Sequence, residues 1–253
     1  SLDILRGQCA DKFGVDAILG FIPRQHVGDE QCIWEVCLRT RPFGGDPQEG
    51  GYGNRDTQTP HCARLAREGV RFNHCISNSP VCTPYRGILF SGQHPLNCGS
   101  IQNDLQILPG KGTYFAEVLR DAGYRTGYYG KWHLYGGDRV RGIPAGPYRY
   151  GFDHEFLTNN CTLLYDAARA YYWDQDGTTR KLYGDWEPYA QTRQAMEFVD
   201  RHADKPFALF LSWHPPHNWG RAHEGYDAPP DLLALYDPAT LTLDPATLES
   251  RIT

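Results

Sequence analysis

The run FALFLSW, from Phe207 to Trp213, is continuously apolar apart from one serine. A run of this kind is typical of a strand that is buried on both faces of a parallel sheet. The segment before it, Gln191 to His202, carries apolar side chains at helical spacing. A helix that leads into a buried strand indicates an α/β protein.

The same alternation is found upstream. Thr113 to Ala122 predicts a helix that ends at Gly123, and Tyr124 to Tyr129 predicts the strand after it. Pro84 to Phe90 predicts a short helix, and Val70 to Ile76 predicts a further strand. We therefore expect a mainly parallel sheet flanked by helices. Ligands of such sheets bind at the carboxyl ends of the strands.

Composition excludes several classes of function. The net charge of -5 and the lack of a basic run argue against a nucleic-acid partner. No apolar run approaches the roughly 20 residues that a membrane helix needs, so we expect no membrane partner. No signal peptide is visible at the start of the sequence. The compartment is therefore undetermined, and a periplasmic, secreted or cytoplasmic location stays open.

Cys82 is the first candidate for chemistry. It opens a predicted helix, where backbone N–H groups and the helix dipole favour an anion. Arg86, one turn further on, adds a charge-assisted donor. The pair suits a nucleophile that attacks an anionic ester, while a small buried cysteine is the ordinary alternative. The eight cysteines form no C-x-x-C pair, and the two His-Cys dipeptides lack the spacing of a zinc site.

Two further polar clusters follow predicted strands. Lys131 and His133 are two residues apart, so on an extended segment they would point the same way. An ammonium and an imidazole that converge can bind an anion and move a proton. His214 and His217 follow the apolar run in a proline-rich loop, and their spacing does not decide which of them acts. Each of these residues alone is more often structural.

Three motifs together resemble the sulfatase family. The stretch CTPYR at 82–86 matches the family signature Cys-x-Pro-x-Arg, and GKWHL at 130–134 resembles a second signature. The stretch LSWHPPHN at 211–218 resembles a third segment. Three signatures in the family's order are far more specific than any one of them. The resemblance runs from about Tyr52 to Pro245.

The resemblance implies an alkaline-phosphatase-like α/β fold and a modified nucleophile. In such enzymes a maturation enzyme oxidises the signature cysteine, here Cys82, to formylglycine, whose hydrate attacks the sulfur of a sulfate ester. Arg86 would hold the formylglycine, and Lys131 would bind it and the sulfate. His133 would take the proton from the hydrate, and His217 would bind sulfate or assist the leaving group.

The resemblance also implies a divalent cation, Ca²⁺ or Mg²⁺, with the formylglycine made from Cys82 as one ligand. The expected partners are a sulfated small molecule or sulfated sugar and a formylglycine-generating maturation enzyme. The adjacent acidic residues that the family places upstream are absent here, since Asp29 is too far upstream and Asp46 lies in a glycine-rich loop. The other family ligands lie beyond position 253, so we expect an incomplete copy of the fold at its C-terminal side.

We therefore expect an atypical N-terminal segment at 1–51, the N-terminal part of a sulfatase catalytic domain at 52–247 and a tail at 248–253. The leading hypothesis is hydrolysis of sulfate esters. One alternative is a phosphate or phosphonate ester hydrolase of the same superfamily, and another is a non-catalytic, degenerate sulfatase-like protein. The aromatic and acidic stretch from Tyr165 to Trp186 is either a pocket lining or a packed surface insertion.

The missing carboxylates generate a prediction for the 253-residue chain alone. We expect weak sulfate binding, no tight Ca²⁺ or Mg²⁺ site and negligible turnover of an aryl sulfate. A hard, hydrated cation needs several oxygen ligands, and a formylglycine at position 82 supplies one. Calorimetric titration with Ca²⁺ and a chromogenic sulfate ester measure these properties. Stoichiometric micromolar binding with Cys82-dependent turnover would show instead that Asp29 or Asp46 serves as a ligand.

Overall fold

The computed structural model describes residues 58, 60–69, 79–215, 217, 228–237 and 239–240. They fall into two compact units, one with residues 79–217 and the other with the remaining ranges. The predicted strand from Val70 to Ile76 and the segment 1–51 lie outside the described residues. The smaller unit is linked internally by Gln58, whose N–H donates to the Tyr236 hydroxyl at 3.1 Å.

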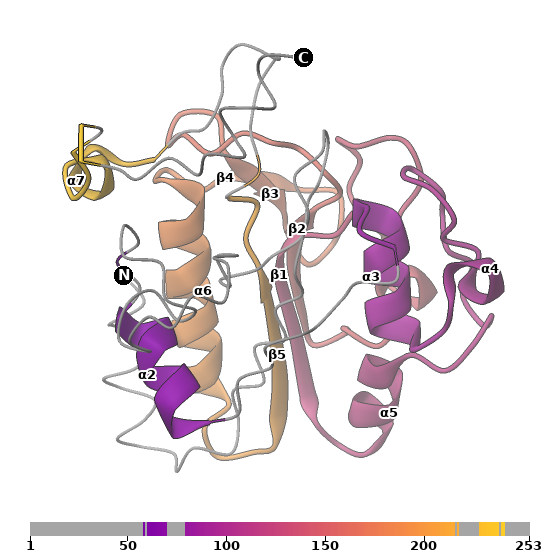
Figure 1. Cartoon of the computed structure of the whole chain (residues 1–253). Coiled ribbons are helices and arrows are strands. Elements are labelled where there is room, and N and C mark those ends of the chain that lie inside the picture. The colour runs from indigo at the N-terminus through magenta and orange to yellow at the C-terminus, as the bar shows by residue number, and fades with distance from the viewer. Residues whose placement is uncertain are drawn as a thin grey trace. The chain divides into compact units, whose positions relative to one another are not determined.

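A five-stranded mixed sheet is the centre of the larger unit (Figure 1). The strand order is β4-β3-β2-β1-β5, and β1 pairs in parallel with both β2 and β5. The remaining two pairings, β2 with β3 and β3 with β4, are antiparallel. The predicted parallel sheet is thus confirmed for three neighbouring strands, β2, β1 and β5. The strands are β1 Arg125–Lys131, β2 Glu155–Asn159, β3 Tyr171–Trp173, β4 Arg180–Leu182 and β5 Phe207–Ser212.

Helices cover both faces of this sheet. Figure 1 shows α6 on one face and α3 and α5 on the other. The predicted helices are confirmed with shifted ends, and α6 begins four residues early because Pro188 fits its first turn. No helix in the described part of the chain is long and apolar enough to cross a bilayer. The helices of this unit are α3 Cys82–Ser91, α4 Pro95–Cys98, α5 Phe115–Asp121, the short 3-10 helix η1 Pro147–Arg149 and α6 Glu187–Arg201; the smaller unit holds α2 Pro60–Glu68 and α7 Pro230–Leu233.

Two apolar cores lie on the two faces of the sheet, because successive side chains of a strand point to opposite faces. Tyr128 of β1 belongs to the larger core, where its ring lies 5.9 Å from that of Phe90 in α3 and 5.7 Å from that of Phe210 in β5. Tyr129, the next residue, packs in the smaller core against Phe198 of α6 at 6.2 Å. Strand β1 is therefore buried on both faces and fixes the position of its carboxyl end.

Strand β5 is less buried than the sequence predicts. Residues 207–211 are half-buried and only Ser212 is buried. Among the described strands β5 pairs only with β1 and forms an edge of the sheet. The prediction that this run is buried on both faces is wrong for residues 207–211, whereas β1 is buried from Thr126 to Lys131.

Gly130 allows β1 and β5 to approach each other next to the carboxyl ends of both strands. Its φ is +100°, in the region that favours glycine. A Cβ atom at this position would lie 2.0 Å from the backbone oxygen of Ser212. Both the backbone angle and the close approach therefore require glycine here.

We expect Gly130→Ala to lower the free energy of unfolding by about 3 kcal/mol or more, since it combines left-handed strain with a backbone clash. Gly99→Ala is the matched control, because Gly99 has a φ of +82° and an added Cβ would meet nothing within 4 Å. The free energy of unfolding of that variant should fall by only about 1 kcal/mol, through backbone strain. Urea unfolding measures both values, and an equal fall in the two variants would contradict the close approach of β1 and β5 at Gly130.

Candidate active site

Cys82 is the first residue of α3 and lies at the carboxyl edge of the sheet. The residue before it, Val81, is extended with φ −129° and ψ 147°, so α3 begins at the cysteine as predicted. The Cys82 side chain is 2% exposed. The Nζ atom of Lys131, the last residue of β1, lies 3.7 Å from its Sγ atom. Two of the predicted site residues are therefore brought into direct contact.

Arg86 is buried one turn along α3 and fastens this helix to the sheet. Its Nη1 atom donates to the backbone oxygen of Lys131 at 2.8 Å and to the Tyr128 hydroxyl at 2.9 Å. Its Nη2 atom donates to the Ser212 hydroxyl at 3.1 Å. Arg86 thus holds the backbone that carries Lys131, and the role of holding a formylglycine directly stays a prediction.

His133 is buried beside Cys82, although not for the reason that the sequence offered. Its φ is +53°, so the segment is not extended there and the alternation argument fails. The backbone instead turns, and the His133 N–H donates to the Asn160 oxygen at 2.5 Å. The hydroxyl of Thr83, next to Cys82 in α3, donates to the His133 oxygen at 2.8 Å. Tertiary hydrogen bonds therefore bring His133 to the nucleophile.

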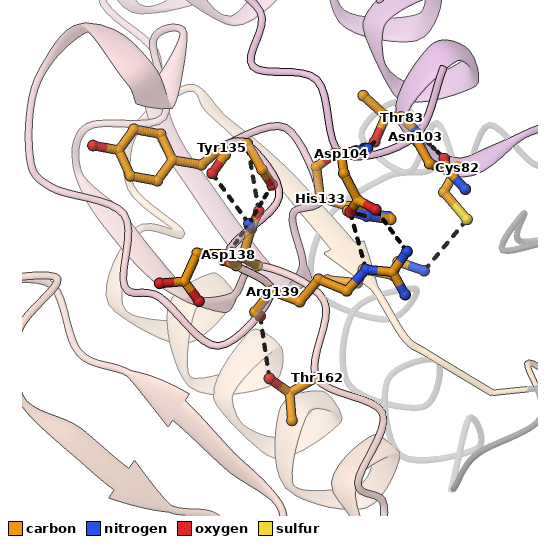
Figure 2. Close-up of polar contacts among 12 residues, drawn as sticks. Cys82, Thr83, Asn103, Asp104, His133, Tyr135, Asp138, Arg139 and Thr162 are labelled. Atoms are coloured by element: carbon orange, nitrogen blue, oxygen red, sulfur yellow. Dashed lines mark hydrogen bonds and ion pairs between the residues drawn. The ribbon is translucent and has the colours of Figure 1, made fainter. Parts of the chain in front are cut away.

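Asp104 and Arg139 complete this cluster, and no sequence motif predicted either of them (Figure 2). The Nε2 atom of His133 lies 2.8 Å from Oδ1 of Asp104. Arg139 donates to both oxygens of Asp104, from Nε at 2.9 Å and from Nη2 at 2.8 Å. Asp104 itself has a φ of +65°. Two residues with left-handed backbones thus meet through their side chains, an arrangement that is more common at functional sites.

The pKa values of this cluster are shifted in opposite directions. Hydrogen bonds from Arg139 lower the pKa of Asp104, burial opposes them, and the bond from His133 lowers it further. Burial alone would lower the pKa of His133, but the neighbouring Cys161 and Cys82 thiols outweigh burial, and the pKa is raised. Both shifts act toward the charged forms, the carboxylate of Asp104 and the imidazolium of His133.

The third predicted cluster follows β5. His214 is buried, and its Nδ1 atom lies 2.9 Å from Oε2 of the fully buried Glu187. His217 is half-buried; its N–H donates to the His214 oxygen at 3.1 Å, and its own oxygen accepts from the Tyr165 hydroxyl at 2.8 Å. Glu187 and Tyr165 were not predicted as partners. The sequence carries one signal for Glu187, because an acidic residue directly before a proline is typical of the first turn of a helix.

The described residues do not by themselves fit a divalent cation. They contain no group of three or more His, Cys, Asp or Glu side chains that could hold a metal. Ca²⁺ and Mg²⁺ require several oxygen ligands. Asp29 and Asp46 lie outside the described residues, and the prediction of Cys82 as a metal ligand stays a prediction.

Comparison with known proteins gives a consistent picture. The family model described as Sulfatase matches residues 44–241. An ulvan-active sulfatase of Formosa agariphila is 35% identical over 198 residues, which cover 77% of this chain and 37% of that protein. A steryl-sulfatase of Rattus norvegicus is 37% identical over 47% of this chain and 22% of that protein. The chain spans about a third or less of the length of these curated relatives.

Solved structures share the fold. The structure of yidJ from Bacteroides fragilis is 28% identical with a TM-score of 0.56, over 63% of this chain and 39% of that chain. Another, solved in complex with its substrate D-glucosamine-2-N,6-O-disulfate, is 26% identical with a TM-score of 0.54, over 70% of this chain and 33% of that chain.

We expect Asp104→Asn to destabilise the chain at pH 7 by about 1 kcal/mol, because the amide carries no negative charge and offers Arg139 one acceptor oxygen in place of two. The folded pKa of Asp104 is lowered, so its stabilisation is complete above its unfolded pKa and is lost as the pH falls through the folded value. The difference in the free energy of unfolding between wild type and variant should therefore disappear as the pH falls below about 4. Urea unfolding at several pH values measures it.

Asp138→Asn is the matched control, since Asp138 is exposed and its carboxylate accepts from the N–H of Val140. This variant should stay within about 0.5 kcal/mol of wild type at every pH. If the loss of unfolding free energy in Asp104→Asn did not depend on pH, this would contradict an ionic role for the carboxylate.

Proposed function

Because this chain belongs to the sulfatase family, we propose that its site hydrolyses sulfate esters with a nucleophile made from Cys82. The observation that carries the proposal is the contact of 3.7 Å between Lys131 Nζ and Cys82 Sγ at the beginning of α3. A fixed ammonium and a helix N-terminus both stabilise negative charge at this point. An anionic ester is the substrate that such an arrangement favours.

The proposed nucleophile is formylglycine, produced from Cys82 by a maturation enzyme that supplies the oxidant. One hydroxyl of its hydrate attacks sulfur and the S–O bond to the alcohol breaks, so that the alcohol leaves with the proton that the attacking hydroxyl gives up. The second hydroxyl then gives its proton to His133, the bond from carbon to the sulfated oxygen breaks, and the aldehyde forms again as sulfate leaves. His133 lies next to Cys82, and the Asp104 carboxylate at its Nε2 atom would stabilise the imidazolium that forms when His133 accepts this proton, which supports its role as base.

Arg86 and Lys131 have distinct parts in this proposal. Lys131 binds the anion, since its ammonium is buried and in contact with the nucleophile position. Arg86 positions Lys131 through the 2.8 Å bond to its backbone oxygen. A divalent cation, Ca²⁺ or Mg²⁺, would further reduce the negative charge at the nucleophile and the sulfate, with position 82 as one ligand.

We propose a sulfated sugar or a similar sulfated small molecule as the substrate class. One relative is named as active on ulvan, and one structural neighbour was solved with a disulfated glucosamine. His217 would bind the sulfate or assist the leaving group, because it follows the carboxyl end of β5 beside β1.

The nucleophile can be tested directly. When the chain is made together with a formylglycine-generating enzyme, the peptide that contains residues 82–86 should carry an aldehyde that reacts with hydrazides. Mass spectrometry of the labelled peptides measures this conversion. Cys98 is the internal control, since it is buried but lies outside the signature, and it should remain a thiol. An unmodified thiol at Cys82 would favour a non-catalytic protein.

The converted chain also separates two reactions of the superfamily. Any turnover that depends on Cys82 should be faster with an aryl sulfate than with the matching aryl phosphate. The reverse preference would make the protein a phosphate ester hydrolase. Cys82→Ser, made in parallel, shows which part of either rate depends on the modified residue.

A further inference from the structure

We propose that Tyr165, Glu187 and His214 form a closed ring of hydrogen bonds that positions His217. The inference rests on the proposed function only for the role of His217 at the sulfate. The hydrogen bonds of the ring do not depend on any activity. All three are positioning residues, because they act through His217 and not on the substrate.

The first link of the ring is a buried hydrogen bond between two side chains. The side chains of Glu187 and His214 are both fully buried, and Nδ1 of His214 lies 3.0 and 2.9 Å from the two carboxylate oxygens. A buried carboxylate without a partner is costly, so Glu187 fixes the orientation of the imidazole. The Nε2 atom of His214 makes no hydrogen bond within the part of the chain that the structure describes. The bond between Nδ1 and Glu187 is therefore the side-chain hydrogen bond that orients the imidazole of His214.

Three further hydrogen bonds close the ring through the backbone. The N–H of His217 donates to the oxygen of His214 at 3.1 Å. The oxygen of His217 accepts from the Tyr165 hydroxyl at 2.8 Å. The oxygen of Tyr165 in turn accepts from the N–H of Glu187 at 2.9 Å, which returns to the buried pair. Both backbone polar groups of His217 are thus fixed by the ring.

The ring joins three distant parts of the larger unit. Tyr165 lies between β2 and β3, Glu187 is the first residue of α6, and His214 follows β5. The residues His214 and His217 follow β5, which pairs in parallel with β1. The ring connects them to α6, which packs on β1 and β5 and carries Glu187.

The matched test compares two tyrosines. Tyr165 and Tyr150 are both 0% exposed, and each donates its hydroxyl to a backbone oxygen, that of His217 at 2.8 Å and that of Ile107 at 2.7 Å. Phenylalanine at either position removes one equivalent hydrogen bond, so both variants should show a similar fall in Tm. Only Tyr165→Phe should disturb His217.

The readout is amide exchange in the chain labelled with ¹⁵N-histidine, which contains only 10 histidines. We expect exchange of the His217 amide to be roughly fivefold to tenfold faster in Tyr165→Phe, as for one lost hydrogen bond, and unchanged in Tyr150→Phe. Glu187→Ala should accelerate it at least as much. Glu187→Gln, whose amide oxygen can still accept from Nδ1, should restore most of the protection.

Equal exchange at His217 in wild type and Tyr165→Phe would overturn the inference, whatever the activity of the chain. If Glu187→Ala does not fold, the two tyrosine variants still decide the matter. Titration of the same samples with inorganic sulfate tests the role of His217 separately. Weaker sulfate binding in Tyr165→Phe but not in Tyr150→Phe is the expected result. Faster exchange without sulfate binding in any sample would leave the ring standing and contradict the sulfatase function.

Discussion

The buried guanidinium of Arg86 is the interaction on which the site depends. One side chain links α3 to the ends of β1 and β5 through the Lys131 oxygen and the Tyr128 and Ser212 hydroxyls. A buried positive charge requires such a set of acceptors, because an unmade hydrogen bond in the interior is costly. The planar, forked donor also fixes direction. The helix that begins with Cys82 is thereby held against the strand that ends with Lys131.

The site is assembled at the place where two parallel strands end together. Gly130 and Ser212 are register partners, and only glycine permits their close approach. The residues that follow each strand can then turn over the same edge of the sheet. This arrangement brings His133 from one strand end and His214 from the other to defined positions, although β5 lies at the edge of the described sheet.

Two buried histidines of this region are each held by a carboxylate that lies far away in the sequence. Asp104 contacts His133 at 2.8 Å, and Glu187 contacts His214 at 2.9 Å. The first pair is partly open to solvent and shared with Arg139, whereas the second is completely buried. The first can therefore take part in proton transfer next to Cys82, while the second is suited to holding a loop in place.

The sequence alone determined the α/β class, the helix that begins at Cys82, and the candidates Cys82, Arg86, Lys131, His133 and His217, since apolar periodicity and short motifs are local properties. Local pattern could not assign Asp104, Arg139, Tyr165 or Glu187, because each acts through a contact with a residue distant in the chain. It also misjudged the burial of β5 and the backbone conformation at His133, since burial depends on which strands pair and a left-handed turn depends on the hydrogen bonds that hold it. Tertiary structure decided these features because their energies arise only when separate segments of the chain meet.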